Sequence, residues 1–578
     1  MASADLSDVW PGQIVLDVEY RDRDLVRSVP GAKWIRDRLW RVPCTWAVCL
    51  AMRGVFGERL EIGEALEKWA WDELRGRVEP AIEARDLAMD PANSWIQVEP
   101  ICSPDLWDQL RSYQRTGARF LEVAGSAVLA DDMGLGKTVE TIATLERCSS
   151  YPALIVCPKG VKENWREAFE RWAPHREVSL VGTGAGKARA LAAEADVTIV
   201  NYETLRTASR IAGYGSIRLT PAERQDKALN RPWGAVVADE AHRAKDPKAK
   251  TTRALWAVGA TAQRRLALTG TPIANSPEDF WSLLHFVAPD EWPSRSTYLD
   301  RYCLVTAGFW GGIEILGLRP DTKDEFYASV DCRLLRRPKE LVASDLPPKQ
   351  YVVRYAPMAP KQERAYKAMV DDMVAWLDKD AVAAFDPLVQ TTRLIQFASS
   401  YAEVVDGKVK LAAPSGKIDA LIELLDEMGD EPLVVFAQSR QLIDLACAAL
   451  SKPSVNISHV RITGSETEAQ RNAARADFRR GDARVVLLTL GAGSTGLDGL
   501  QDRASTVCFL QRSYSLIENR QAEDRLHRIG QENPVTVIDL ITPGTVEETA
   551  VLPAVEGKAD MLEEIVRDRA ALRRLIAR

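Results

Sequence analysis

A glycine-rich loop at residues 129–138, LADDMGLGKT, constrains the fold of this chain more than any other stretch. An apolar run of strand length leads into it at 126–130, and apolar residues at helical spacing follow at 139–148. Glycines between a strand and a helix let several backbone N–H groups point at one anion, at the positive end of the helix. The pattern predicts a nucleotide-phosphate cradle in an α/β fold. The alternative is a surface turn that happens to contain Gly-Lys-Thr.

The side chains around this loop indicate how a nucleotide would be held. Lys137 is predicted to reach the terminal phosphates, and the Thr138 hydroxyl is predicted to ligate Mg²⁺. Gln114, in the stretch LRSYQ ahead of the loop, is expected to read the adenine edge through paired hydrogen bonds. Asp131 stands where the GxxxxGK[ST] pattern has its first glycine. The other predicted ATP-binding residues are Asp132, Met133, Gly134, Leu135 and Gly136.

Composition narrows the class of protein. With 578 residues, of which 46% are hydrophobic and 27% charged, the chain is long enough for about three or four globular domains. It has no apolar run of membrane-spanning length and no signal-peptide pattern, which predicts an intracellular protein with no membrane partner. Nine cysteines without a CxxC pair and five histidines without HxxH or HExxH argue against zinc sites. A net charge of −7 argues against a uniform nucleic-acid coat, so basic DNA-binding residues are expected in a cleft.

Strands and helices alternate after the loop, as in a doubly wound parallel sheet. The expected strands of this first lobe are 153–157, 197–201, 235–238 and 265–268. The third delivers the sequence DEAH at 239–242 to the end of a strand, where ligands gather in such sheets. Asp239 is predicted to hold Mg²⁺ together with Thr138, and Glu240 to orient and deprotonate the attacking water. His242 belongs to this site or is a packing residue.

The alternation of strands and helices restarts after residue 415, without a second phosphate loop. The expected strands are 432–436, 459–462, 484–489, 506–510 and 535–542. Two sheets with one nucleotide loop predict a site shared across a cleft. The stretch QAEDRLHRIGQ at 521–531 spaces Arg525 and Arg528 three apart, on nearly one face if the segment is helical. Two guanidinium groups there would neutralise charge in the transition state, and a solvent-facing basic helix end is the alternative.

Three further stretches have two interpretations each. The turn TGTP at 269–272 is a relay between the nucleotide and the second lobe, or a plain loop. The turn GAGSTGLDG at 491–499 lets the backbone approach a phosphate chain, although glycine turns are frequent. The stretch WIRDRLWRV at 34–42 interleaves arginines with tryptophans, which fits base stacking with phosphate contacts. It equally fits the core of a small domain with a solvated basic face.

Taken in order, these motifs resemble those of the Swi/Snf-related ATPases within helicase superfamily two. The resemblance spans about residues 106–549, and its motifs are LRSYQ, LADDMGLGKT, LIVCPKGVKENW, VNYETL, DEAH, LTGTPIANSPEDFW, LLRRPKE, DLPPK, SGK, the glycine turn and QAEDRLHRIGQ. It implies two RecA-like lobes that close on ATP with Mg²⁺ and track along duplex DNA, usually without separating the strands. It also accounts for Asp131, because that family tolerates an acidic residue at this position.

The resemblance implies roles for individual residues. Lys137, Glu240, Arg525 and Arg528 would be catalytic, the two arginines acting as fingers from the second lobe. The residues implied near DNA or on the coupling path are Lys159, Asn201, Thr269, Thr271, Ser439, Gly496 and Gln521. Two stretches depart from the family pattern, RSYS at 512–515 in place of a Trp-Asn-Pro motif and DGL at 498–500 in place of Asn-Leu.

The N-terminal stretch PGAKWIRDRLWRVP at 30–43 is similar to the HARP-type module of annealing helicases, which implies recognition of fork-like DNA. The arginine- and alanine-rich chain resembles a bacterial or bacteriophage member of the family. A cytoplasmic location is then expected, or a nuclear one if the source is eukaryotic. The expected domains are a HARP-like domain at 1–100, an ATP-binding lobe at 101–340, a helical connector at 341–413 and a second lobe at 414–578.

The sequence thus predicts an α/β protein with two RecA-like doubly wound lobes, helical insertions and a small α+β N-terminal domain. The predicted function is a DNA-dependent ATPase, a monomeric motor on duplex or branched DNA that couples ATP hydrolysis to remodelling or annealing. One rival is a strand-separating DNA helicase or an RNA helicase. Another is a DNA-binding scaffold whose ATPase is vestigial.

Overall fold

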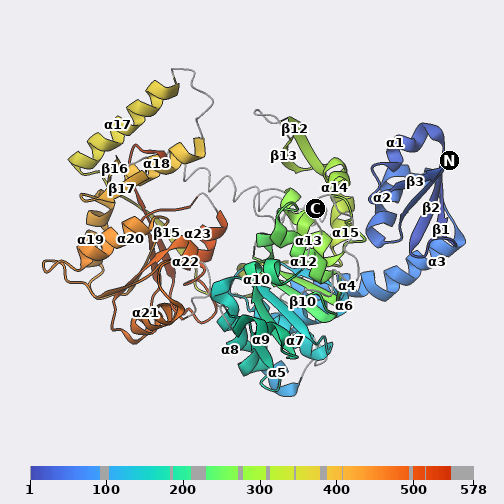
Figure 1. The fold of residues 1–578 in the computed structure, drawn as a ribbon, viewed down its shortest axis with the longest axis horizontal. Coiled ribbons are helices and arrows are strands. Elements are labelled where there is room, and N and C mark those ends of the chain that lie inside the picture. The colour runs from blue at the N-terminus through green and yellow to red at the C-terminus, as the bar shows by residue number, and fades with distance from the viewer. Residues whose placement is uncertain are drawn as a thin grey trace. The chain divides into compact units, whose positions relative to one another are not determined.

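The chain divides into two units, Met1–Val342 and Ala343–Arg578, each built on parallel sheet with helices around it (Figure 1). The computed structural model describes residues 2–90, 103–182, 186–209, 229–270, 277–307, 313–343, 346–377, 387–405, 408–493, 499–513 and 516–548. Among these residues, no helix combines the length and the apolar composition that crossing a membrane requires.

A five-stranded sheet in the order β3-β4-β2-β1-β5 forms the N-terminal part of the first unit. Its strands are β1 (Ala2–Leu6), β2 (Gln13–Val18), β3 (Lys33–Arg36), β4 (Leu39–Pro43) and β5 (Leu60–Ile62). Alternate residues of β2, such as Ile14 and Leu16, are buried in one core with Val48 and Met52 of α2 (Trp46–Phe56). This part matches the α+β domain of the predicted fold class.

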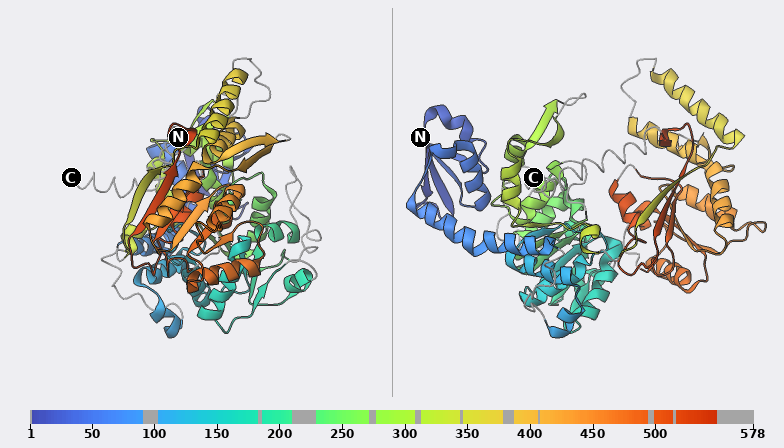
Figure 2. Two further views of the ribbon diagram at one scale, coloured as in Figure 1. Left: turned by 90° about the vertical axis from the view of Figure 1, so that its left-hand side faces the viewer. Right: turned by 180° about the vertical axis from the view of Figure 1, so that it is seen from behind.

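A long helical run leads from this small sheet to the first lobe (Figure 2). It consists of α3 (Glu64–Glu73), a π-helical turn (Leu74–Val78) and α4 (Glu79–Met89). α4 packs against α6 (Ser112–Ala124), so that Ala81 and Phe120 belong to one core. The N-terminal part therefore contributes to the core of the lobe.

The first lobe is a seven-stranded parallel sheet in the order β14-β6-β11-β10-β7-β9-β8. Its strands are β6 (Ala127–Leu129), β7 (Ala153–Cys157), β8 (Val178–Leu180), β9 (Val197–Asn201), β10 (Trp233–Asp239), β11 (Ala262–Leu268) and β14 (Leu334–Leu335). The order places β6, β11 and β10 side by side. Because all strands are parallel, the segments that follow these three strands meet at one edge of the sheet.

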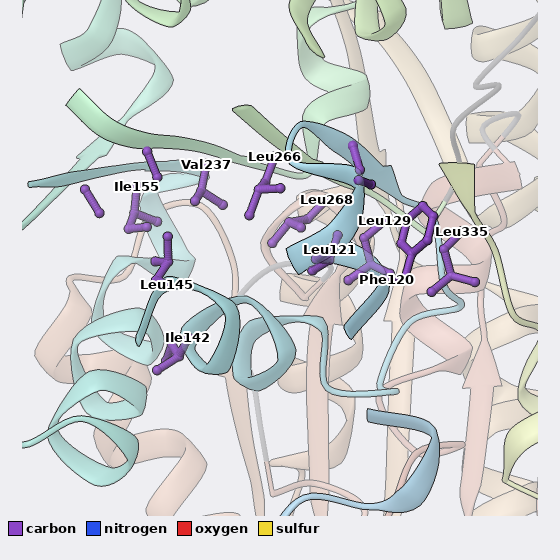
Figure 3. Packing of buried hydrophobic residues seen from close by; sticks show 14 of the residues in the cluster. Phe120, Leu121, Leu129, Ile142, Leu145, Ile155, Val237, Leu266, Leu268 and Leu335 are labelled. Atoms are coloured by element: carbon purple, nitrogen blue, oxygen red, sulfur yellow. The ribbon is translucent and has the colours of Figure 1, made fainter. Parts of the chain in front are cut away.

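The core of this lobe lies between the sheet and its helices. Figure 3 shows side chains of the strands meeting those of α6 and of α7 (Lys137–Arg147). The labelled residues are Phe120, Leu121, Leu129, Ile142, Leu145, Ile155, Val237, Leu266, Leu268 and Leu335. Strands that are buried on both faces read as continuous apolar runs, which is why the sequence revealed them.

Helices cover both faces of this sheet and build the insertions. They are α5 (Pro104–Gln109), α8 (Lys162–Trp172), α9 (Gly186–Ala192), α10 (Tyr202–Ala208), α12 (Lys250–Gly259), α13 (Pro277–Val287), α14 (Arg295–Tyr302), α15 (Lys323–Val330) and α16 (Lys339–Val342). A hairpin of β12 (Cys303–Ala307) and β13 (Ile313–Leu318) projects between α14 and α15. This insertion folds around Trp292, Tyr298, Tyr302 and Phe326, whose rings contact one another.

The second unit carries a six-stranded parallel sheet in the order β15-β22-β21-β18-β20-β19. Its strands are β15 (Lys349–Tyr355), β18 (Leu433–Ala437), β19 (His459–Ile462), β20 (Val485–Thr489), β21 (Thr506–Phe509) and β22 (Val535–Ile541). Its helices are α17 (Pro360–Leu377), α18 (Pro387–Ser399), α19 (Gly416–Glu427), α20 (Arg440–Leu450), α21 (Glu468–Arg480), α22 (Leu490–Gly493) and α23 (Leu516–Glu523). The two lobes confirm the predicted fold class.

The stretch 341–413, predicted as a helical connector, is more than that. Besides α17 and α18 it contains β15, an edge strand of the second sheet, and a hairpin of β16 (Tyr401–Val405) and β17 (Lys408–Ala412). The second unit accordingly begins at Ala343. The sequence KQYVVRY hid this strand because β15 pairs on one side only and leaves Tyr351 and Val353 exposed.

Candidate nucleotide-binding site

The phosphate loop joins β6 to the first turn of α7. Gly134 and Gly136 have φ angles of 82° and 86°, in the left-handed region that favours glycine. A Cβ on Gly136 would lie 2.3 Å from Gln114 Nε2, so a larger residue there would displace the Gln114 side chain as well as strain the backbone. The Lys137 ammonium donates hydrogen bonds to the carbonyls of Asp131 (2.6 Å) and Asp132 (3.1 Å), which places the charge against the loop backbone. The loop has the compact, glycine-dependent shape of a phosphate cradle.

Gln114 lies against this loop, as the sequence predicted for a nucleotide-binding residue. Its side chain is 7% exposed; Nε2 donates to the Leu135 carbonyl at 3.1 Å and Oε1 accepts from the Arg111 N–H at 3.0 Å. The hydroxyl of Tyr113 donates to the same Leu135 carbonyl at 2.7 Å. A carboxamide offers two N–H donors and two lone pairs, so one of each is left for an adenine edge. The contact with adenine stays a prediction.

The carboxylates of the DEAH stretch stand at the end of β10. Asp239 Oδ2 accepts from the Trp165 indole N–H at 2.8 Å, and Oδ1 accepts from the Glu240 N–H at 2.9 Å. The Tyr202 hydroxyl donates to the Asp239 carbonyl at 2.8 Å. Glu240 has a φ angle of 52°, a costly conformation for a residue with a side chain. Both the side chain and the backbone of Asp239 are therefore held in place.

Burial sets the protonation of this cluster. Burial and the neighbouring charge of Glu240 raise the pKa of Asp239 to about 6, against the lowering effect of the Trp165 hydrogen bond. Burial, with Arg243 and Lys245 nearby, lowers the pKa of His242 to about 4. His242 is thus neutral at physiological pH, and its Nδ1 lies 3.4 Å from Glu240 Oε2.

The segment after β11 lies between the phosphate loop and the DEAH residues, because β11 is flanked by β6 and β10. Thr269 is buried; its N–H donates to the Leu129 carbonyl at 3.0 Å, and its Oγ1 lies 3.3 Å from His242 Nδ1. A Cβ on Gly270 would lie 2.8 Å from the Met133 side chain, so Met133 packs on this glycine. The structure thus brings Thr269 to both motifs, while Thr271 lies outside the described residues.

The residues present fit Mg²⁺ held together with a nucleotide. Within the described part of the chain, no cluster of three or more His, Cys, Asp or Glu side chains forms a complete metal cage. Mg²⁺ bound with ATP needs one or two carboxylates, because phosphates and waters fill its other positions. Asp239 supplies an oriented carboxylate, and Thr138 supplies a hydroxyl from the first turn of α7.

Three predicted DNA-contact or coupling residues also follow strands. Lys159 lies just after β7, and Asn201 ends β9, where its side chain accepts from the Thr204 N–H at 2.7 Å and caps α10. Ser439 precedes α20 in the second unit, and its N–H donates to Gln511 Oε1 at 2.9 Å. Their contacts with DNA stay predictions, and Gly496 lies outside the described residues.

The shared face of Arg525 and Arg528 was predicted on the condition that their segment is helical, and the structure does not meet that condition. Gln521 lies in α23, but this helix ends at Glu523, so Arg525 and Arg528 do not share a helical face. Beyond it the backbone tightens into turns: the Arg525 N–H donates to Ala522 and the Arg528 N–H to Leu526. Within these turns the side chain of Leu526 is buried in the core of the lobe. The role of the arginines as fingers stays a prediction.

A charged network that the sequence did not reveal surrounds the start of this turn. Lys349 Nζ lies 3.1 Å from both Glu523 Oε2 and Asp524 Oδ1. Arg512 Nη1 donates to Glu523 Oε1 at 2.7 Å, and its Nε donates to Asp539 at 2.6 Å. Arg512 begins the RSYS stretch that departs from the family pattern, so the network gives that departure a structural reason. The signal was present in the DLPPK motif, which contains Lys349.

Two further residues escaped the sequence analysis although they lie in recognised motifs. Trp165, from LIVCPKGVKENW, orients Asp239 as described above. Arg337, from LLRRPKE, is fully buried and pairs with Asp131 and Glu140. Both act through contacts between stretches far apart in the sequence.

Comparison with known proteins identifies the domains. Residues 74–401 match the SNF2-related domain, which is more than half of the chain, and residues 416–530 match the helicase conserved C-terminal domain. A chromodomain-helicase-DNA-binding protein 1-like of Mus musculus is 31% identical over 467 residues, covering 76% of this chain and 48% of the relative. A SWI/SNF-related regulator of chromatin subfamily A-like protein 1 of Bos taurus is 29% identical over 474 residues, covering 79% and 45%.

The chain therefore spans less than half the length of these curated relatives. Among solved structures, a Sulfolobus solfataricus SWI2/SNF2 ATPase core in complex with dsDNA aligns at 24% identity with a TM-score of 0.36, covering 81% of this chain and 94% of that one. The two relatives named are eukaryotic, and neither supports the expected bacterial or bacteriophage origin. That origin stays a prediction, as do the cytoplasmic location and the HARP-type subgroup. The two domain matches, in this order along one chain, show that the protein belongs to the SNF2-related ATPase family.

Proposed function

We propose that this protein is a DNA-dependent ATPase whose hydrolysis of ATP drives movement along duplex DNA. Family membership supports the ATPase assignment. The observation that carries the proposal is the meeting of the Lys137 loop with Asp239 and Glu240 at one edge of one sheet, with Asp239 oriented by Trp165. Phosphoanhydride hydrolysis is mostly positioning and charge neutralisation, which is what these groups offer.

Each side chain has a definite task in this proposal. Lys137 holds the terminal phosphates, and two of its three N–H donors are already fixed on loop carbonyls. Thr138 and Asp239 hold Mg²⁺, which when bound neutralises phosphate charge. Glu240 orients the attacking water and takes its proton. Arg525 and Arg528 of the second unit would neutralise the charge that develops on the transferred phosphate.

Two substitutions test the catalytic assignment. Lys137→Ala and Glu240→Gln should abolish ATP hydrolysis while DNA binding survives. Glu170→Gln, an exposed carboxylate on α8, is the matched control and should hydrolyse ATP at the wild-type rate. If Lys137→Ala or Glu240→Gln still hydrolyses ATP, the catalytic role of the replaced residue is refuted.

We propose that the lobes hold DNA mainly through its phosphate backbone. Binding should then be largely independent of sequence and sensitive to salt. Lys159→Ala should weaken binding equally across DNA sequences and lower the slope of log K against log salt by about 1. A loss of affinity confined to one sequence would contradict this.

For branched DNA, we propose that the β3-β4 hairpin supplies the contact, as a HARP-type module would. Trp34 is 61% exposed and lies two residues before the exposed Arg36 on β3, whereas Trp40 is buried in the small core. Trp40 therefore fits the core of a small domain, and Trp34 is accessible for the base stacking that we propose. An exposed aromatic ring beside a guanidinium can stack on a base and contact its phosphate. Arg38 is paired with Asp17 at 2.9 Å and is less suited to this task.

Point variants test this hairpin better than truncation, because removing the N-terminal part would strip α4 from the core of the lobe. Steady-state ATPase rates would be compared without nucleic acid and with single-stranded DNA, blunt duplex, forked DNA and structured RNA. Trp34→Ala with Arg36→Ala should remove the preference for forked DNA and leave duplex stimulation unchanged. Trp71→Ala, an exposed tryptophan on α3, is the control.

These ATPase rates, together with strand-displacement and triplex-displacement assays, separate the rival functions. Stimulation by RNA alone would favour an RNA-directed enzyme, and strand displacement from tailed duplexes without triplex displacement would favour a strand-separating helicase. Absence of any DNA-stimulated turnover would support a scaffold with a vestigial ATPase. The paired Lys137 and the oriented Asp239 speak against that last function.

A further inference from the structure

The phosphate loop is bonded to the segment by which the chain leaves the first lobe. The N–H of Ala130 donates to the Leu335 carbonyl at 2.7 Å, and the N–H of Asp132 donates to the Arg337 carbonyl at 3.1 Å. The N–H of Lys339 donates back to Asp132 Oδ2 at 3.1 Å. The pairing of β14 with β6 thus continues past both strands, alongside the first residues of the loop. The first unit ends three residues after Lys339, at Val342.

Three fully buried ionisable side chains meet beside this ladder: Asp131 and Arg337 on its two strands, and Glu140 on α7. Arg337 Nε donates to Asp131 Oδ1 at 3.1 Å and to Oδ2 at 3.0 Å, and Nη2 donates to both carboxylate oxygens of Glu140 at 2.9 Å. The Arg337 N–H donates to Asp131 Oδ1 at 2.9 Å, and Nη1 donates to the Tyr113 carbonyl. All three side chains have 0% exposure. Water therefore cannot replace any of these partners.

The two carboxylates bracket the loop. Asp131 precedes its glycines, and Glu140 follows them in the first turn of α7. One guanidinium therefore holds both ends of the loop, between which lie the N–H groups that face a phosphate. We call Asp131, Arg337 and Glu140 the loop clamp.

The surroundings are built to fit the loop clamp. Gly117 lies inside α6, where glycine is unfavourable relative to alanine. A Cβ there would lie 2.1 Å from Glu140 Oε2 and 2.6 Å from Arg337 Nη2. The absence of a side chain at Gly117 leaves the space that Glu140 and Arg337 occupy. The clamp also explains Asp131, because glycine at that position would leave Arg337 without its main partner.

We infer that Arg337 is a positioning residue for ATP: by clamping Asp131 and Glu140 it holds the phosphate loop in its binding shape and ties that shape to the exit of the first lobe. This inference rests on the proposed function, because it assumes that the loop binds ATP. Arg337 is fully buried, out of reach of a bound nucleotide. Its effect reaches the nucleotide through the loop backbone.

The test compares two buried arginines of the same unit. Arg337→Lys keeps the charge but loses the planar fork that holds two carboxylates at once. Arg301→Lys is the matched control, since Arg301 is also buried and its Nε donates to Glu325 at 2.7 Å, between α14 and α15. Calorimetric titration with Mg²⁺ and a non-hydrolysable ATP analogue gives the affinity, and thermal unfolding gives the stability.

Both variants should unfold at lower temperature than wild type. Arg337→Lys should also bind the analogue at least about tenfold more weakly, because displacing a binding loop by about 1 Å costs that much or more. Arg301→Lys should bind within about twofold of wild type, since no phosphate-binding group moves. Equal affinities in the two variants would overturn the clamp.

Two further outcomes are kept distinct. If wild type itself does not bind the analogue, the proposed function fails. If Arg337→Lys does not fold, Asp131→Asn takes its place, because Arg337 then stays balanced by Glu140 while the front end of the loop is released. Weaker binding in Asp131→Asn supports the clamp, and unchanged binding refutes it.

Discussion

Replacing Trp165 with phenylalanine removes the N–H that donates to Asp239 and leaves an aromatic ring in the core. The indole is fully buried in α8 and donates to Asp239 Oδ2 at 2.8 Å. The matched control is Trp233→Phe, at the start of β10. That indole is equally buried, but it donates to the carbonyl of Leu229, at 3.1 Å. Both variants lose a hydrogen bond and some volume, and only the first loses a contact with a carboxylate.

The size of the effect follows from the charge on Asp239. A hydrogen bond to a charged group contributes about 1.5–3 kcal/mol, which corresponds to roughly one to two orders of magnitude in rate. Burial and Glu240 raise the pKa of Asp239 to about 6, and the Trp165 bond opposes that rise. Without the bond the pKa moves further up, so less of the carboxylate is ionised at pH 7. Trp165→Phe should therefore lower kcat and shift the acid limb of the rate profile to higher pH.

The assay is steady-state ATP hydrolysis with saturating duplex DNA, measured against Mg²⁺ concentration and from pH 6 to 9. Trp165→Phe should need more Mg²⁺ for half-maximal rate than wild type, and raised Mg²⁺ or pH should restore part of the rate. Trp233→Phe should follow the wild-type curves. If the two variants share one Mg²⁺ and pH dependence, Trp165 serves packing alone and the orientation argument is refuted.

Three further predictions concern other buried contacts. Lys349→Met should lower kcat by about tenfold with little change in ATP affinity, because the turn bearing Arg525 loses its contact with Lys349. DNA-stimulated hydrolysis measures kcat and nucleotide titration measures the affinity. An unchanged kcat would contradict this. His242 has its pKa lowered to about 4 by burial, so the unfolded chain binds more protons than the folded one between about pH 6.5 and 4, and stability falls as the pH drops through that window. His242→Gln should reduce that loss of stability by up to about 3 kcal/mol. The urea unfolding midpoint of the variant should then drop less than that of wild type between pH 7 and 4.5. Equal drops would refute the contribution of His242. Gly117→Ala should destabilise the protein by about 1–3 kcal/mol, because the new methyl group overpacks against Glu140. Helix propensity alone predicts a gain in stability. The sign of the shift in the thermal unfolding midpoint therefore distinguishes the two effects.

Much of the fold could be read from the residues because buried parallel strands are continuous apolar runs. The strands at 153–157 and 197–201 were predicted with the bounds that the structure has. Strand β14 was missed because it is two residues long, and β15 because it is an exposed edge strand. Both depend on pairing with strands that are distant in the sequence, which no local pattern reports.

The turn that bears Arg525 and Arg528 shows the same limit. Their spacing fits a helix, but α23 ends at Glu523. Beyond it Leu526 is buried in the core, and Lys349 pairs with Glu523 and Asp524. Spacing along the chain states which residues can share a face. Packing decides whether the helix that would align them exists.

The sequence by itself determined the chemistry that depends on neighbours a few residues apart: the glycines that curve the phosphate loop, Lys137 after them, and Asp239 with Glu240 at the end of a strand. Only the tertiary structure decided which partners hold these groups. Asp131 is paired with Arg337, 206 residues away, and Asp239 with Trp165, 74 residues away. A buried charge needs a partner in contact. The chain offers 75 lysines and arginines, and the folded core alone selects which of them meets Asp131.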